Sequence, residues 1–146
     1  MSCTPPETVV LVDDNKIDNR LHKRVIERTG LVKTVLTFAM PQEALAYMRE
    51  PGGIPVDLML LDINMPGMDG FEMLEAAIDE FGGAFDPSVV VMLTTSMDPK
   101  DRERAQNFSM ISDYFMKPLS TSVFQELYNR LGTTGARDQT VIRSVG

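Results

Sequence analysis

One carboxylate of this 146-residue chain stands between an apolar run and a turn signature. The run 58–61 reads Leu-Met-Leu-Leu, which is typical of a strand buried on both faces, and Asp62 follows it directly. Because an ionised carboxylate is unstable inside such a strand, we expect Asp62 at its end, partly in water. Pro66, Gly67 and Gly70 then force a tight loop. A carboxylate held in this way is a candidate nucleophile or metal ligand, and an aspartate that only starts a turn is the alternative.

Two adjacent acids follow a second apolar run. The run 8–12 ends on Asp13, Asp14 and Asn15. Adjacent acids at a strand end repel each other, and a hard cation with oxygen ligands would offset that repulsion. Capping of the next helix by one of these three residues is the alternative explanation. One cap does not require two acids and an amide, so the sequence favours a metal site.

Two further predicted strands end on polar side chains. The run 89–93 precedes Thr94 and Thr95, and the run 113–116 precedes Lys117. In an open parallel α/β sheet, the carboxyl ends of the strands share one edge, and sites form there. Each residue alone has an ordinary explanation as a strand threonine or an exposed lysine. The joint appearance of acids, hydroxyl and ammonium at four strand ends, in this order, has no such ordinary explanation and indicates a functional site at this edge.

Apolar spacing predicts five strands that alternate with five helices. This alternation indicates an α/β fold with a doubly wound, five-stranded parallel sheet in the order 2-1-3-4-5, a flavodoxin-like arrangement. The predicted strands are 8–12, 34–38, 56–61, 89–93 and 113–116. The predicted helices are 16–29, 41–50, 71–80, one that starts at 99, and 121–131.

The spacing also predicts which side chains these helices bury. For the first helix we expect an inward stripe of Ile17, Leu21 and Val25, with His22 on the surface. The fourth helix has few apolar residues, and those expected to pack are Ala105, Phe108 and Met110. Little apolar burial means that this helix can shift at low cost.

Composition restricts the function classes. The net charge of −7 argues against nucleic-acid binding, and no apolar stretch approaches membrane-spanning length. The single cysteine, Cys3, excludes an intrachain disulfide. We therefore expect a cytoplasmic protein with one domain over 8–132, followed by a tail, 133–146, that is largely disordered.

The ordered set resembles the receiver domain of response regulators, in particular the stand-alone, chemotaxis-regulator-like members. The similarity runs from about 8 to 131, and its motifs are Asp13-Asp14, Asp62 with Met65-Pro66 and Asp69-Gly70, Thr94, and Lys117-Pro118. The resemblance implies that Asp62 is the phosphoacceptor. It also implies that Mg²⁺ is held by Asp14, Asp62 and the backbone carbonyl of Asn64, with Asp13 acting mainly through a bound water.

The resemblance assigns further roles at the same edge. Lys117 would pair with the phosphoryl group, Thr94 and Tyr114 would form the switch pair, and Asn64 and Thr95 would tune the reaction rates. The chain would be a single-domain phosphoacceptor rather than an enzyme, and it would assist its own phosphorylation and dephosphorylation. Its donor would be a sensor histidine kinase or a histidine-phosphotransfer protein. Its switching surface, helix four, strand five and helix five, would signal to an unidentified protein, or the phosphoryl group would be relayed.

Three other functions fit the architecture less well. A haloacid-dehalogenase-like phosphatase needs an acid two positions beyond its nucleophile, whereas Asp13 and Asp14 are adjacent. A flavin-binding module needs a phosphate loop rich in Ser, Thr or Gly after the first strand, and the two acids there would repel a phosphate. A degenerate receiver that serves only as a scaffold would lack some of the site residues, and all of them are present.

Overall fold

The predicted architecture is confirmed by a computed structural model that describes residues 7–50, 56–82, 89–95 and 98–132. Five parallel strands form one sheet in the order β2-β1-β3-β4-β5. The strands are β1 (Thr8–Val12), β2 (Thr34–Phe38), β3 (Leu58–Asp62), β4 (Val89–Thr94) and β5 (Ile111–Met116). The helices are α1 (Lys16–Thr29), α2 (Pro41–Arg49), α3 (Gly70–Phe81), α4 (Pro99–Ala105) and α5 (Thr121–Gly132).

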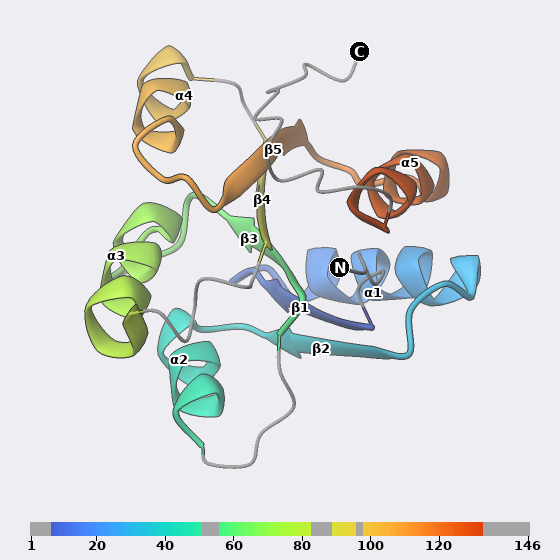
Figure 1. Ribbon diagram of the computed structural model, residues 1–146, viewed down its shortest axis with the longest axis horizontal. Helices are drawn as coiled ribbons and strands as arrows, with labels where there is room; N and C mark the ends of the chain where they lie inside the picture. Colours follow the sequence, from blue (N-terminus) through green and yellow to red (C-terminus); the bar gives the residue numbers. More distant parts are fainter. Residues whose placement is uncertain (1–6, 51–55, 83–88, 96–97, 133–146) are drawn as a thin grey trace.

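Helices cover both faces of the sheet. α1 and α5 lie on one face, and α2, α3 and α4 lie on the other (Figure 1). Alternate residues of β1 pack to opposite sides, with Val10 and Val12 in the core under α2 and α3, and Val9 and Leu11 in the core under α1 and α5. Burial on both faces explains why the strands read as continuous apolar runs.

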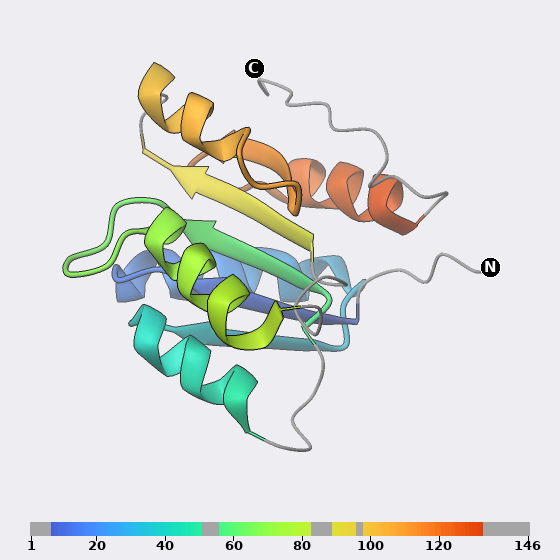
Figure 2. The same cartoon turned by 60° about the vertical axis from the view of Figure 1, so that its left-hand side comes forward.

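The strand register brings the predicted site residues to one edge. Asp62, the last residue of β3, pairs with Leu93, and Thr94, the last residue of β4, pairs with Met116. The arrows of β3 and β4 point toward the same edge, where the loop after β3 extends from the sheet (Figure 2). The backbone N–H of Lys117 donates to the carbonyl oxygen of Thr94 at 2.7 Å, which joins two of the strand ends directly.

The predicted inward stripe of α1 is wrong for Ile17 and Leu21, whereas Val25 packs against the core as expected. Ile17 and Leu21 are 67% and 52% exposed, and the residues that α1 buries are Asn19, His22 and Ile26. These three follow the helical spacing i, i+3, i+7, but two of them are polar. A pattern based on apolar residues could not detect a face whose polar side chains form hydrogen bonds with other parts of the fold.

The expectation of weak apolar burial in α4 is confirmed. Asp98 caps the helix by accepting the backbone N–H of Lys100 at 2.9 Å, and Ala105 is the one residue of the helix that is buried. Phe108 packs beyond the helix end, with its ring centroid 5.8 Å from that of Phe71 in α3. α4 is therefore held mainly at its carboxyl end.

Some predictions concern parts of the chain that the structure does not describe. The expected tail 133–146, the predicted loop residues 83–88 and the residues 51–55 lie outside the described ranges. Within the described ranges, no helix combines the length and the apolar character that crossing a membrane requires.

Candidate functional site

Three carboxylates meet where β1 and β3 end. Asp13, Asp14 and Asp62 each offer an oxygen, and these oxygens lie within 4.8 Å of one another. Asp13 and Asp62 are 3% and 5% exposed, whereas Asp14 is exposed to solvent. Carboxylate oxygens at this spacing, open to water on one side, suit a hard divalent cation that keeps some of its water ligands.

Neither of the two acids in the turn after β1 caps the helix that follows. Asn15 caps α1, because its side-chain oxygen accepts the backbone N–H groups of Ile17 and Asp18 at 2.9 and 3.1 Å. Asp13 in turn accepts the N–H of Asn15 at 2.9 Å. The helix cap is therefore supplied by the amide rather than by either acid. This separates the capping explanation from the acid cluster.

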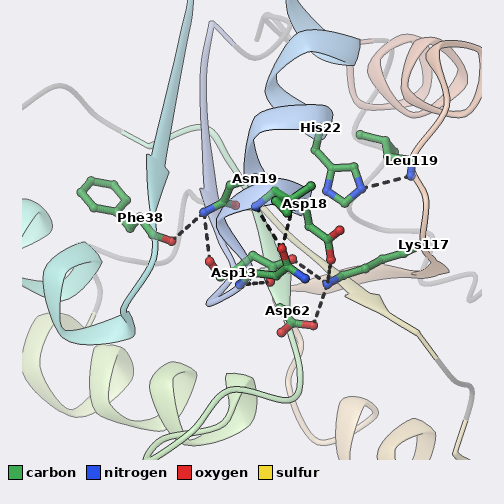
Figure 3. A network of polar contacts seen from close by, with 10 residues as sticks. Asp13, Asp18, Asn19, His22, Phe38, Asp62, Lys117 and Leu119 are labelled. Atoms are coloured by element: carbon green, nitrogen blue, oxygen red, sulfur yellow. Dashed lines mark hydrogen bonds and ion pairs between the residues drawn. The ribbon is translucent and has the colours of Figure 1, made fainter.

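The buried side chain of Asn19 ties this turn to the neighbouring strand. Its amide nitrogen donates to the backbone oxygens of Asp13 and Phe38 at 3.0 and 3.1 Å (Figure 3). The backbone N–H of Asp13 also donates to the oxygen of Phe38 at 3.1 Å. These bonds fix the position of Asp13 at the sheet edge.

The loop after Asp62 is held in one conformation. Gly67 has a φ of 83°, which suits the third residue of a type II turn that begins with Met65 and has Pro66 in second place. At Gly70, a Cβ atom would lie 2.5 Å from the backbone oxygen of Asp62, so only glycine allows this approach. The loop therefore packs directly against the backbone of the candidate phosphoacceptor.

A capping box closes the same loop. Asp69 accepts the N–H of Glu72 at 2.8 Å, and Glu72 accepts the N–H of Asp69 at 2.8 Å. The second oxygen of Asp69 accepts from Arg104 of α4 at 3.1 Å, and the guanidinium of Arg104 lies 4.4 Å from the ring centroid of Phe71. Arg104 thus links the end of α4 to the start of α3. Apolar spacing could not predict this contact, because Arg104 is a charged residue.

Lys117 lies among carboxylates from three elements (Figure 3). Its Nζ atom is 2.6 Å from Asp13, 3.0 Å from Asp18 and 3.3 Å from Asp62. Its side chain is 9% exposed, and its peptide bond to Pro118 is cis. The contact of Asp18 with Lys117 was not predicted from the sequence. The one signal that could have indicated it is an acid in the first turn of the helix that follows the two site acids.

The burial of these charges changes their acidity. Burial, followed by repulsion from Asp13, raises the pKa of Asp62 to about 6, against the attraction of Lys117. Burial alone would lower the pKa of Lys117, but its hydrogen bonds to Asp13 and Asp18 and the attraction of Asp62 outweigh burial and raise it. Near neutral pH the site therefore holds an ionised Asp62 next to a charged ammonium.

Thr94 and Tyr114, the predicted switch pair, are both fully buried. Burial raises the pKa of the Tyr114 hydroxyl to about 12, and this hydroxyl has no hydrogen-bond partner among the described residues. The Tyr114 side chain therefore lies inside the core. The predicted tuning residues, Asn64 and Thr95, are both exposed, the first in the loop after β3 and the second directly after β4.

His22, predicted to lie on the surface, is buried instead. It is 3% exposed, and its Nε2 atom accepts the backbone N–H of Leu119 at 3.4 Å. Burial, together with the charge of Lys117, lowers the pKa of His22, so the imidazole is neutral near pH 7. His22 is buried because the loop after Lys117 packs over this side of α1, a contact that the sequence of the helix does not indicate.

Comparison with known proteins agrees with this geometry. The model of the response regulator receiver domain family matches residues 9–129. The chain belongs to the response regulator receiver domain family. A crystal structure of a two-component response regulator from Cytophaga hutchinsonii is 29% identical to this receiver domain, with a TM-score of 0.80 over 87% of this chain and 97% of that one.

Curated relatives of this receiver domain include proteins of different size. Response regulator Rcp1 of Synechocystis is 31% identical over 105 residues, which cover 66% of this chain and 67% of Rcp1. Hybrid signal transduction histidine kinase L of Dictyostelium discoideum is 28% identical over 128 residues, which cover 87% of this chain and 7% of the kinase. The chain therefore spans only a small part of some of the relatives that it matches.

Proposed function

We propose that Asp62 accepts a phosphoryl group from a sensor histidine kinase or a histidine-phosphotransfer protein, in a reaction that requires Mg²⁺. The observation that carries this proposal is the contact of Lys117 with the cluster of Asp13, Asp14 and Asp62 at the sheet edge. In the transfer, an oxygen of Asp62 forms a bond to phosphorus while the bond from phosphorus to the donor imidazole nitrogen breaks. The receiver domain 8–132 is the unit that performs this reaction.

The residues present fit a magnesium ion. Asp14 and Asp62 would hold it with the backbone carbonyl of Asn64, because the two carboxylates each offer an oxygen within 4.8 Å of the other and Asp14 is exposed to solvent. Asp13 would act through a water, because its oxygens already accept from Asn15 and Lys117. A bound Mg²⁺ would neutralise part of the negative charge that the phosphoryl group brings.

The protein groups contribute orientation and charge. With a pKa near 6, Asp62 is mostly ionised at pH 7 and so is in its nucleophilic form. Lys117 offers an ammonium 3.3 Å from Asp62, close enough to pair with an oxygen of the transferring group. Thr94 adds a hydroxyl at the neighbouring strand end, and the exposed residues Asn64, after β3, and Thr95, after β4, can tune both reactions of the aspartyl phosphate.

The surface beside the site suits a protein donor. Ile17 and Leu21 expose large apolar side chains on α1, next to the turn that carries Asp13 and Asp14. The exposed basic residues Lys16 and Arg20 lie on the same helix, although the chain as a whole has a net charge of −7. Apolar residues among cations favour docking of a helical protein surface with acidic and apolar side chains. We propose that the protein acts in the cytoplasm as a signalling protein, without enzymatic turnover of a separate substrate.

The proposal is tested by intact mass after incubation with acetyl phosphate. The chain should gain the mass of one phosphoryl group when Mg²⁺ is present and should gain none in EDTA. A chain that never gains this mass, or that gains it equally in EDTA, would contradict the proposed reaction. Steady release of phosphate from a phosphate monoester would favour the phosphatase alternative.

Phosphorylation should also change the surface around α4. We expect that beryllofluoride, a phosphoryl mimic, shifts backbone amide resonances most strongly at Thr94, at 98–108 and at Tyr114. The physical reason is that α4 buries little and depends on the contacts of Arg104 with Asp69 and Phe71, which a small shift of the loop would break.

The measurement is a pair of amide correlation spectra in Mg²⁺, recorded before and after beryllofluoride is added. Because Tyr114 is already buried, its ring should remain protected from solvent in both states. Asp62→Asn is the control and should show no shifts at α4. Shifts confined to the turns that carry the acids would leave the switch without support.

A further inference from the structure

The ammonium of Lys117 is shared between the candidate phosphoacceptor and an acid outside the metal cluster. Asp18 of α1 accepts from Nζ at 3.0 Å, and Asp62 lies 3.3 Å from the same atom. Figure 3 shows Nζ between these two carboxylates, with Asp13 at 2.6 Å as the third partner. An ammonium has three N–H donors, so one carboxylate for each donor leaves none for a new acceptor.

The backbone around Lys117 is held without Asp18. The N–H of Lys117 donates to the oxygen of Thr94 at 2.7 Å, and the N–H of Leu119 donates to His22 at 3.4 Å. The second bond is long and correspondingly weak. Asp18 therefore acts on the ammonium rather than on the path of the chain. Asp18 is also not the cap of α1, because Asn15 has that role.

We propose that Asp18 is a positioning residue that holds Lys117 back from the phosphoryl group, and so weakens the phosphorylated state. This inference rests on the proposed function. A phosphoryl group on Asp62 adds negative charge and new acceptor oxygens, and Lys117 must turn toward them. Asp18 opposes this twice, because it occupies one N–H donor and adds a negative charge near the new group. The repulsion disappears when Asp18 loses its charge, and a neutral acceptor holds the N–H donor more weakly than a carboxylate does.

The test is the affinity for beryllofluoride in saturating Mg²⁺. Asp18→Asn should bind beryllofluoride about three- to tenfold more tightly than the wild type, the size expected for removing one like charge at several Å near the surface. The same variant should show a lower apparent KM for acetyl phosphate. In nitrogen NMR, the resonance of the Lys117 ammonium should shift, because its hydrogen bond to the Asp18 carboxylate at 3.0 Å is lost. A purely structural role for Asp18 would not move this signal.

Matched variants separate position from charge. Glu27→Gln removes one exposed negative charge from the same helix and should leave beryllofluoride affinity unchanged. Asp18→Glu keeps the carboxylate and should stay near the wild-type value. Asp18→Ser is a second neutral variant, in case the asparagine variant does not fold.

The outcomes distinguish this inference from the proposed function. If the wild type itself does not bind beryllofluoride, the proposed function fails. If the wild type binds but the neutral variants bind equally or more weakly, Asp18 does not restrain Lys117 and the inference is overturned. Tighter binding by the neutral variants, with no change in Glu27→Gln, supports it.

Discussion

Replacing Asp62 with asparagine is expected to abolish phosphorylation by acetyl phosphate. The substitution keeps the shape of the side chain but removes the anionic oxygen that must form the bond to phosphorus. The backbone around it should persist, because Gly70 and the capping box of Asp69 hold the loop through contacts that do not involve the carboxylate of Asp62. The measurement is intact mass in Mg²⁺, in which the wild type should gain one phosphoryl group and Asp62→Asn none.

A control for this experiment lies at the other end of the same strand. Asp57 precedes β3 and accepts the backbone N–H groups of Glu7 and Thr8 at 2.9 and 3.0 Å. Asp57→Asn keeps an acceptor oxygen and removes one charge far from the site, so it should be phosphorylated like the wild type. Equal labelling of Asp62→Asn, with peptide mapping that finds no label on Asp13 or Asp14, would refute the assignment of the phosphoacceptor.

The same substitution is expected to stabilise the metal-free protein. The pKa of Asp62 is about 6 in the folded state, above the value of about 3.9 for an unfolded chain. The folded state therefore binds this proton more tightly than the unfolded state. The contribution to stability is fully present below pH 4 and is lost as pH rises through 6. At pH 8 in EDTA, Asp62→Asn should raise the free energy of unfolding by about 1 to 3 kcal/mol.

Two changes of condition test the cause of this stabilisation. At pH 4.5 the advantage of Asp62→Asn over the wild type should shrink, because the wild-type carboxyl is then mostly protonated. In Mg²⁺ at ten times its dissociation constant, the wild type should gain about 1.4 kcal/mol, and Asp62→Asn should lose most of that gain. Thermal and urea unfolding in both buffers at constant ionic strength measure these effects.

Asp14→Asn is the informative comparison for this experiment. Asp14 is exposed, so its removal should stabilise the metal-free protein less than removal of the buried Asp62, but should also lose most of the magnesium effect. A wild type that is indifferent to Mg²⁺ would show that the three acids do not form one metal site. An Asp62→Asn variant that is less stable than the wild type at pH 8 in EDTA would show that the buried carboxylate is not destabilising.

The sequence alone determined the order of the strands and the edge that carries the site. Continuous apolar runs indicated strands buried on both faces, and the alternation of strands and helices indicated a parallel sheet. In such a sheet the carboxyl ends of the strands share one edge, so the acids at the ends of β1 and β3 and the lysine at the end of β5 lie on the same edge. The cluster of Asp13, Asp14 and Asp62 and its contact with Lys117 follow from this geometry.

Only the tertiary structure decided which polar side chains support that site. Asp18, His22 and Arg104 have no local signal for their roles, because their partners lie far along the chain in Lys117, Leu119 and Asp69. For α1, the inward face contains Asn19 and His22, while apolar Ile17 and Leu21 face solvent. Apolar spacing predicts burial by the hydrophobic effect, whereas Asn19 and His22 are buried where the amide nitrogen of Asn19 and the Nε2 atom of His22 have hydrogen-bond partners. Those partners exist only once the sheet edge has assembled.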